Sequence, residues 1–146
     1  MADPESTPRC DIGHMVRHAG DTRPFPLLCA FRCASEGIRY AFTTQRNLKI
    51  HLVFAIAAVA LGFALQVSEA AWLAIVLCIV SVTSLEVVNT AIESVVDMVS
   101  PEWHELARRA KDCAAGAVYI AAIGSLVVAA IVYLPPIAAL AAKLAG

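Results

Sequence analysis

The chain has 146 residues, of which 60% are hydrophobic and 16% charged, and its formal net charge at pH 7 is −1. The length suits one domain, and the absence of a basic patch with interleaved aromatic residues argues against a nucleic-acid partner. The apolar residues form long runs rather than amphipathic stripes, which is typical of a protein that spans a membrane.

Residues 1–26 are polar and show no sustained helical or strand period, so we expect a loose tail. A zinc site is the alternative, because several potential ligands lie in or just after this segment. These ligands are Cys10, His14, His18, Cys29 and Cys33. Their spacing differs from the short C-x2-C pairs of common structural zinc sites, so the sequence favours the loose tail.

Residues 27–146 are predicted to form one all-α membrane domain. An amphipathic helix at 27–43, too short and too charged to cross a bilayer, is expected to lie in the membrane interface. Three transmembrane helices follow, at about 50–67, 70–99 and 113–134.

Short polar signals predict where these helices begin and end. Thr44 is the expected N-cap of the first transmembrane helix. Ser100 and Pro101 are expected to form the N-cap and first turn of the charged segment that precedes the third. Pro135 and Pro136 are expected to end the third helix.

Four polar side chains interrupt the second apolar run: Glu86, Asn89, Glu93 and Asp97. At about 100° per residue they share an arc of about 80° on a helix, while aliphatic residues cover the rest. Ionisable groups within a membrane usually face a bundle interior or a wet cavity and mark function. The alternative is that Asp97, and with it Glu93, lies at the aqueous end, so that only Glu86 is costly to bury.

The basic residues predict the topology. Seven of the eleven precede Ile50, three lie between the second and third spans, and none lies between the first and second. The positive-inside rule then places the N-terminus and the 100–112 loop in the cytosol, and Ser68, Glu69 and the C-terminus outside. The polar stripe is therefore expected to face the cytosol.

These residue types suit chemistry between a lipid and a cytosolic phosphate compound. Glu93, helped by Asp97 or another segment, suits Mg²⁺, which favours one or two carboxylates plus substrate phosphates. Glu86 suits a general base for an alcohol, and Lys111 suits neutralisation of phosphate charge. The residues alone predict a membrane-interface site for a cation and phosphate.

Three segments resemble the small prokaryotic diacylglycerol kinase family, including its undecaprenol kinase branch: residues 45–52, 85–93 and 110–118. The resemblance covers about residues 31–134 and includes the specific pattern E-x-x-N-[ST]-A-I-E-x-x-V-D. It implies an interfacial helix and three transmembrane helices in a bacterial cell membrane, assembled as a homotrimer with active sites between subunits. The implied activity is transfer of the γ-phosphoryl group of Mg·ATP to a lipid alcohol.

The resemblance also implies residue roles. Glu86 matches the catalytic base that takes the proton from the lipid hydroxyl, Asn89 matches a residue supporting that substrate site, and Glu93 matches a magnesium ligand. The implied nucleotide contacts are Asp97, Glu102, His104, Lys111 and Asp112. Where the family carries a second metal-binding glutamate, this chain has Gln45, whose amide oxygen can bind Mg²⁺ but brings no charge. We therefore expect weaker metal binding.

Several functions stay open at this point. Undecaprenol is the favoured substrate, since residues 46–51 and 114–118 look more like that branch, and a diacylglycerol is the alternative. A second class is a binding or regulatory membrane protein derived from the kinase, suggested by Gln45. A third is a small transport or ion-coupling protein, which the carboxylates within a bundle would also suit.

Overall fold

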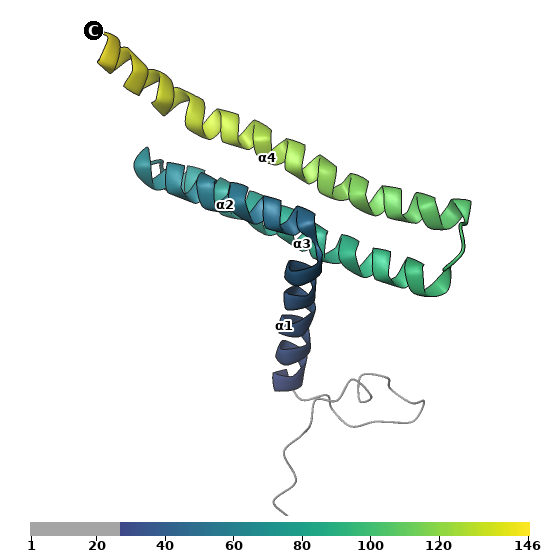
Figure 1. The fold of residues 1–146 in the computed structure, drawn as a ribbon. Helices are drawn as coiled ribbons and strands as arrows, with labels where there is room; N and C mark the ends of the chain where they lie inside the picture. Colours follow the sequence, from purple (N-terminus) through teal and green to yellow (C-terminus); the bar gives the residue numbers. More distant parts are fainter. Residues whose placement is uncertain (1–26) are drawn as a thin grey trace, which may run out of the picture. The chain divides into compact units, whose positions relative to one another are not determined.

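The computed structural model describes residues 27–146, which are almost entirely helical and contain no strand. The four helices are α1 (Leu27–Thr44), α2 (Arg46–Ala64), α3 (Glu69–Val99) and α4 (Glu105–Ala145) (Figure 1). The all-α prediction is confirmed. The prediction of a loose tail concerns residues 1–26, including Cys10, His14 and His18, which lie outside the described residues.

The chain divides into two compact units, at residues 1–40 and 41–146, and each is described by itself. The first unit contains most of α1, where Leu27, Leu28 and Phe31 are exposed. Arg32 and Glu36, one turn apart, form an exposed ion pair at 3.2 Å. This helix has the amphipathic character expected from the sequence, and its place in a membrane interface stays a prediction.

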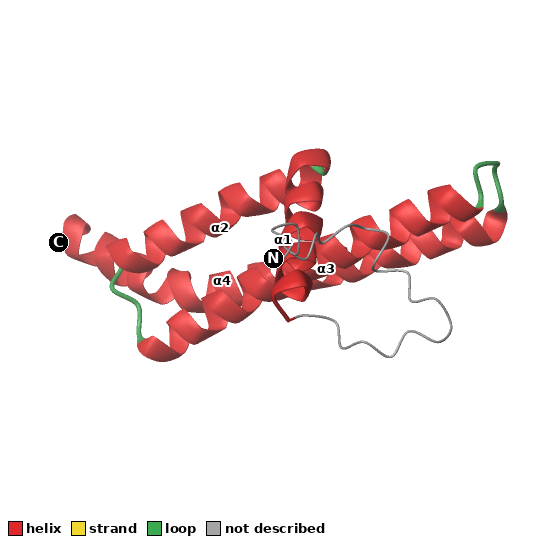
Figure 2. Cartoon of the chain, turned by 90° about the horizontal axis from the view of Figure 1, so that it is seen from below, coloured by secondary structure: helices red, strands yellow, loops and turns green. Residues whose placement is uncertain are grey.

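The second unit contains three helices that are long and apolar enough to cross a bilayer, namely α2 with 19 residues, α3 with 31 and α4 with 41. Short connections join them, so that α3 lies antiparallel to both α2 and α4 (Figures 1 and 2). The expectation of three membrane-crossing helices is confirmed.

Two of the predicted helix starts are wrong. Thr44 is the last residue of α1, and α2 begins after a single extended residue, Gln45. The N-cap of α4 is His104, whose Nδ1 accepts a hydrogen bond from Leu106 N at 3.2 Å. Ser100 cannot cap α4 because it lies in the loop, where its hydroxyl donates to the Glu102 carbonyl at 3.1 Å.

The prediction that Pro135 and Pro136 end the third helix is also wrong, because both lie inside α4, which continues to Ala145. Each proline lacks an N–H group, so two backbone carbonyls of the preceding turn lose their helical donors. The apolar residues that follow still favour a helix, since a membrane offers the backbone no water to bond and tolerates proline within spanning helices.

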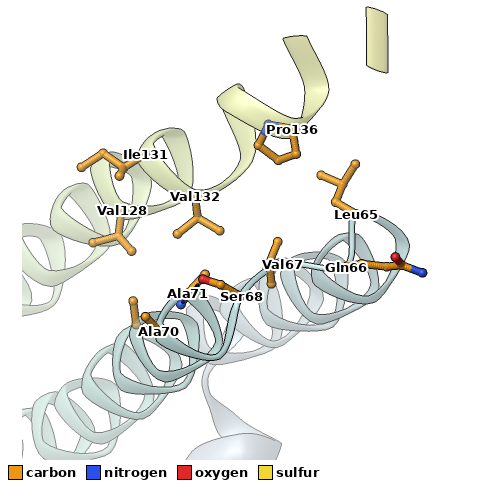
Figure 3. A pocket seen from close by; sticks show the side chains of 11 residues that line it. Leu65, Gln66, Val67, Ser68, Ala70, Ala71, Val128, Ile131, Val132 and Pro136 are labelled. Carbon is orange, nitrogen blue, oxygen red and sulfur yellow. Dashed lines mark hydrogen bonds between the residues drawn. The ribbon is translucent and has the colours of Figure 1, made fainter. Parts of the chain in front are cut away.

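The connection between α2 and α3 is a tight turn at residues 65–68. Gln66 adopts a positive φ of 51°, and Ser68 caps α3 by accepting a hydrogen bond from Ala71 N at 3.3 Å. A cavity of about 640 Å³ separates this turn from α4. Figure 3 shows Val128 and Val132 of α4 pointing across this gap toward Ala70 and Ala71 at the start of α3. The cavity lies at the opposite end of α3 from the carboxylates, so it is not the candidate site.

Specific contacts join the helices near that end. Tyr133 of α4 is buried and donates its hydroxyl to the Ala58 carbonyl of α2 at 2.8 Å. Gly62 of α2 packs against Trp72 of α3 so closely that a Cβ at position 62 would lie 3.0 Å from the indole ring. Phe63 adds a tilted ring contact with Trp72, with centroids 4.6 Å apart. These contacts fix α2 against its neighbours.

Candidate active site

The polar stripe of α3 continues its buried apolar face. Ile75 and Val82 lie on the same side of the helix as Glu86 and Asn89, and all four side chains are buried. Glu86 is only 3% exposed, and Asn89 is 5% exposed. A carboxylate in such a position is costly unless it is partnered, so its surroundings decide what it can do.

Exposure increases along the stripe. Glu93 is half-buried, and the Asp97 side chain is 67% exposed. Asp97 is thus open to its surroundings within this chain, and its place at the aqueous end of the span stays a prediction. The three residues nearer the middle of α3 form the enclosed part of the candidate site.

Glu93 sits in a network of two amides. Gln45 Nε2 donates to Glu93 Oε2 at 3.2 Å, and Asn89 Nδ2 donates to Glu93 Oε1 at 2.9 Å. Gln45 reaches this position because it is the single extended residue between α1 and α2. The residue that replaces the expected glutamate thus lies directly against the predicted magnesium ligand.

Asn89 has one unused hydrogen-bonding atom. Its Oδ1 is buried, and among the described residues it is the one buried side-chain nitrogen or oxygen without a partner. A buried acceptor without a donor is unfavourable, and its presence between two glutamates is typical of a place where a ligand completes the bonding.

Glu86 has a partner that the sequence analysis missed. His51 Nε2 of α2 lies 3.2 Å from Glu86 Oε1, and the imidazole is 25% exposed. The signal was present in the sequence, because His51 is the one ionisable residue of the first predicted span, and such residues usually mark function. Its partner was not predictable, since the contact joins two helices.

Lys111 of α4 forms an ion pair with Asp97 of α3, across the loop that joins the two helices. Both side chains are more than one-third exposed, so the pair contributes little to stability. It does place an ammonium group beside the outer end of the polar stripe, where an anionic ligand would meet it.

The other predicted nucleotide residues are not joined to this cluster. Asp112 forms an ion pair with Arg108, which also contacts Glu105. His104 caps α4, and Glu102 lies exposed in the loop. In the described part of the chain, none of these side chains forms a hydrogen bond with Glu86, Glu93 or Asp97.

The cluster combines a buried carboxylate with a half-buried carboxylate held by amides and an exposed cation. In the described residues no group of three or more His, Cys, Asp or Glu side chains is placed to hold a metal alone. This composition suits Mg²⁺ bound with substrate phosphates rather than in an all-protein cage. It also suits transfer of a phosphoryl group to an alcohol at the membrane surface.

The family is decided by comparison with known proteins. The model of the family described as prokaryotic diacylglycerol kinase matches residues 32–133, which is more than half of the chain. The chain belongs to the prokaryotic diacylglycerol kinase family. It is therefore a lipid kinase of the membrane, and a kinase takes its phosphoryl group from a nucleotide.

Named members of the family resemble the chain to different degrees. A diacylglycerol kinase of Synechocystis is 46% identical over 117 residues, which are 78% of this chain and 66% of that protein. An undecaprenol kinase of Bacillus subtilis is 40% identical over 106 residues, or 73% of this chain and 86% of that protein. The diacylglycerol kinase of Escherichia coli is 33% identical over 92 residues, or 63% of this chain and 75% of that protein.

Proposed function

We propose that this protein transfers the γ-phosphoryl group of Mg·ATP to a membrane lipid alcohol, with undecaprenol as the substrate and Glu86 as the general base. The observation that carries the proposal is the placement of Glu86. It is a buried carboxylate on a membrane-crossing helix, next to a cluster suited to a cation and phosphate. Proton transfer by a positioned carboxylate contributes about 10²–10⁴-fold to such reactions.

The proton and the phosphoryl group move as follows in this proposal. Glu86 accepts the proton of the lipid hydroxyl, and the hydroxyl oxygen of the lipid forms a bond to the γ-phosphorus. The bond between that phosphorus and the bridging oxygen of ADP breaks. Lys111 offsets negative charge on the phosphates, for which its ammonium is free to leave the exposed Asp97 pair at little cost.

The residues around Glu93 fit Mg²⁺ by their chemistry. Glu93 supplies a carboxylate, Gln45 supplies an amide oxygen, and the unpartnered Oδ1 of Asn89 is a further oxygen acceptor in the same network. Oxygen donors of this kind are those that Mg²⁺ prefers. A Mg²⁺ ion held by these residues would offset negative charge on the phosphates. The remaining predicted nucleotide contacts are Asp97, Glu102, His104 and Asp112.

The lipid is proposed on the resemblance of residues 46–51 and 114–118 to the undecaprenol branch, and the Bacillus subtilis relative is named an undecaprenol kinase. A diacylglycerol is the second candidate. It is favoured by the Synechocystis relative, which is 46% identical and named a diacylglycerol kinase.

We also propose that the catalytic end of α3 faces the cytosol of a bacterium and that the protein acts as a homotrimer. The distribution of basic residues supports the orientation, because three of them surround the start of α4 and none lies in the α2–α3 turn. The extensive exposed apolar surface of the three long helices leaves room for contacts with lipid and with further copies.

The test of the substrate is competition between the two lipids. Purified protein in vesicles that contain undecaprenol and a diacylglycerol is given labelled Mg·ATP, and kcat/KM is measured for each product. The proposal predicts a higher kcat/KM for undecaprenol. A preference for the diacylglycerol would establish the second candidate, and absence of transfer to both would refute the kinase proposal in this form.

A further inference from the structure

In the described part of the chain, His51 is the one side chain that forms an ion pair with the Glu86 carboxylate. The two groups come from different helices, with Nε2 of His51 on α2 lying 3.2 Å from Oε1 of Glu86 on α3. Glu86 is 3% exposed, whereas His51 is 25% exposed, so the imidazole stands on the open side of the pair. This contact therefore has a strong influence on which way the carboxylate points.

The surroundings give Glu86 little else to bond. His51 lines an apolar cavity of about 420 Å³ between α2, α3 and α4, whose other lining residues include Phe54, Ile75 and Val82. A buried carboxylate such as that of Glu86 is held in place by a hydrogen-bond donor or left to rotate without one. Thr90, one turn along α3, bonds the Glu86 carbonyl rather than the carboxylate.

We propose that His51 is the positioning residue of the catalytic base: by donating from Nε2 to Oε1, it orients Glu86 so that the second carboxylate oxygen, Oε2, accepts the lipid hydroxyl proton. This inference rests on the proposed role of Glu86. The contact with His51 is made by Oε1 of Glu86, at 3.2 Å from Nε2. One oxygen thus fixes the geometry and the other remains for the substrate.

The expected effect lies in turnover rather than in binding. Loss of orientation at a reacting group costs about 10- to 100-fold in rate when the group stays in the site but is misplaced. Nucleotide and lipid contacts elsewhere are untouched, so both KM values should change less than about twofold when His51 no longer bonds Glu86.

Two polar replacements of different reach test this inference. In His51→Gln the amide nitrogen stands where Nε2 stood and can still donate to Glu86, whereas in His51→Asn the side chain is one methylene shorter and cannot reach. Thr83→Val is the matched control. Thr83 lines the same cavity, but its hydroxyl bonds the Ile79 carbonyl of its own helix at 2.7 Å.

Phosphoryl transfer to the lipid is measured for all variants in vesicles, with kcat and the KM values for ATP and lipid determined separately. Thermal unfolding of each purified variant identifies any loss of folding. We expect His51→Asn to lower kcat by about 10- to 100-fold, while His51→Gln and Thr83→Val stay within about threefold of wild type.

Equal activity of His51→Asn and wild type would overturn the inference, as would equal losses in the Gln and Asn variants or a loss confined to KM. If His51→Asn failed to fold, wild-type turnover in His51→Gln would support the role of the donor and a low turnover would refute it. Inactivity of the wild-type protein itself would instead refute the proposed function.

Discussion

At the scale of single residues, Gln45 is the position where this chain departs from the pattern of the family that it resembles. Its side chain donates to Glu93 at 3.2 Å, so a carboxylate introduced there would lie beside another carboxylate. We predict that Gln45→Glu lowers the Mg²⁺ concentration needed for half-maximal activity by about tenfold, because metal affinity rises with ligand charge.

Without bound metal, Gln45→Glu should be less stable than the wild-type protein. Two neighbouring carboxylates repel each other, so Gln45→Glu is expected to unfold at a lower temperature than wild type in EDTA. Added Mg²⁺ should reverse that loss, because an ion that binds the folded state stabilises it. A Gln45→Glu protein whose metal requirement and stability both match wild type would show that Gln45 is not part of the metal site.

A substitution of Lys111 can distinguish an effect on activity from an effect on stability. Its ion pair with Asp97 joins side chains that are 37% and 67% exposed, and such a pair is worth about 0–1 kcal/mol. We predict that Lys111→Met changes the melting temperature little but lowers kcat/KM for ATP by at least about tenfold, because charge on the phosphates is no longer offset. Comparison of Lys111→Met with Asp97→Asn, which breaks the same ion pair, isolates the contribution of the cation.

At the scale of helices, Gly62 and Gly124 form a natural pair for comparison. A Cβ on Gly62 would lie 3.0 Å from the Trp72 ring, whereas a Cβ on Gly124 of α4 would meet nothing within 4 Å. We predict that Gly62→Ala lowers the free energy of unfolding by about 1–3 kcal/mol through overpacking. Gly124→Ala should raise it by up to about 1 kcal/mol through helix propensity. Denaturant or thermal unfolding in detergent measures both, and an equal effect of the two changes would contradict the packing described for α2 and α3.

The Tyr133 hydroxyl ties α4 to α2 through the Ala58 carbonyl at 2.8 Å. Tyr133→Phe keeps the ring and removes this hydrogen bond, which should cost about 0.5–1.5 kcal/mol of stability. Because Tyr133 lies far along α4 from Lys111, the KM for ATP should not change. A shift in that KM with unchanged unfolding would mean that this contact acts on the catalytic end instead.

The sequence predicted the helices and the shared face of α3 because both depend on local periodicity. Glu86, Asn89 and Glu93 recur with the helical repeat, so their common face needed no knowledge of other helices. The partners of those residues depend on tertiary packing. Gln45 and Glu93 are 48 positions apart, and the His51–Glu86 contact exists only because α2 lies against α3.

The predictions of helix ends that were based on local sequence signals failed at Pro135, Pro136 and Ser100. Pro135 and Pro136 normally end a helix, yet α4 continues through them, since an apolar segment in a membrane gains by keeping its backbone bonded. Ser100 looked like an N-cap but uses its hydroxyl within the loop, and His104 caps α4 in its place.

At the scale of the whole molecule, topology can be measured directly. The predicted orientation exposes the α2–α3 turn outside the cell and the α3–α4 loop to the cytosol. In a chain without native cysteines, we predict that Ser68→Cys reacts with an impermeant maleimide in intact cells, whereas Glu102→Cys reacts only after permeabilisation. The reverse pattern would place the catalytic end of α3 on the wrong side for cytosolic ATP.

The central claim is that Glu86 acts as the base of a lipid kinase, and Glu86→Gln tests it most directly. Glutamine keeps the size of the side chain and accepts a hydrogen bond from His51, but it cannot take up the lipid proton. Transfer of phosphate from labelled Mg·ATP to undecaprenol should fall by about 10²–10⁴-fold, with nucleotide binding and thermal unfolding close to wild type. Turnover within a few-fold of wild type would contradict the claim and move the base to another residue.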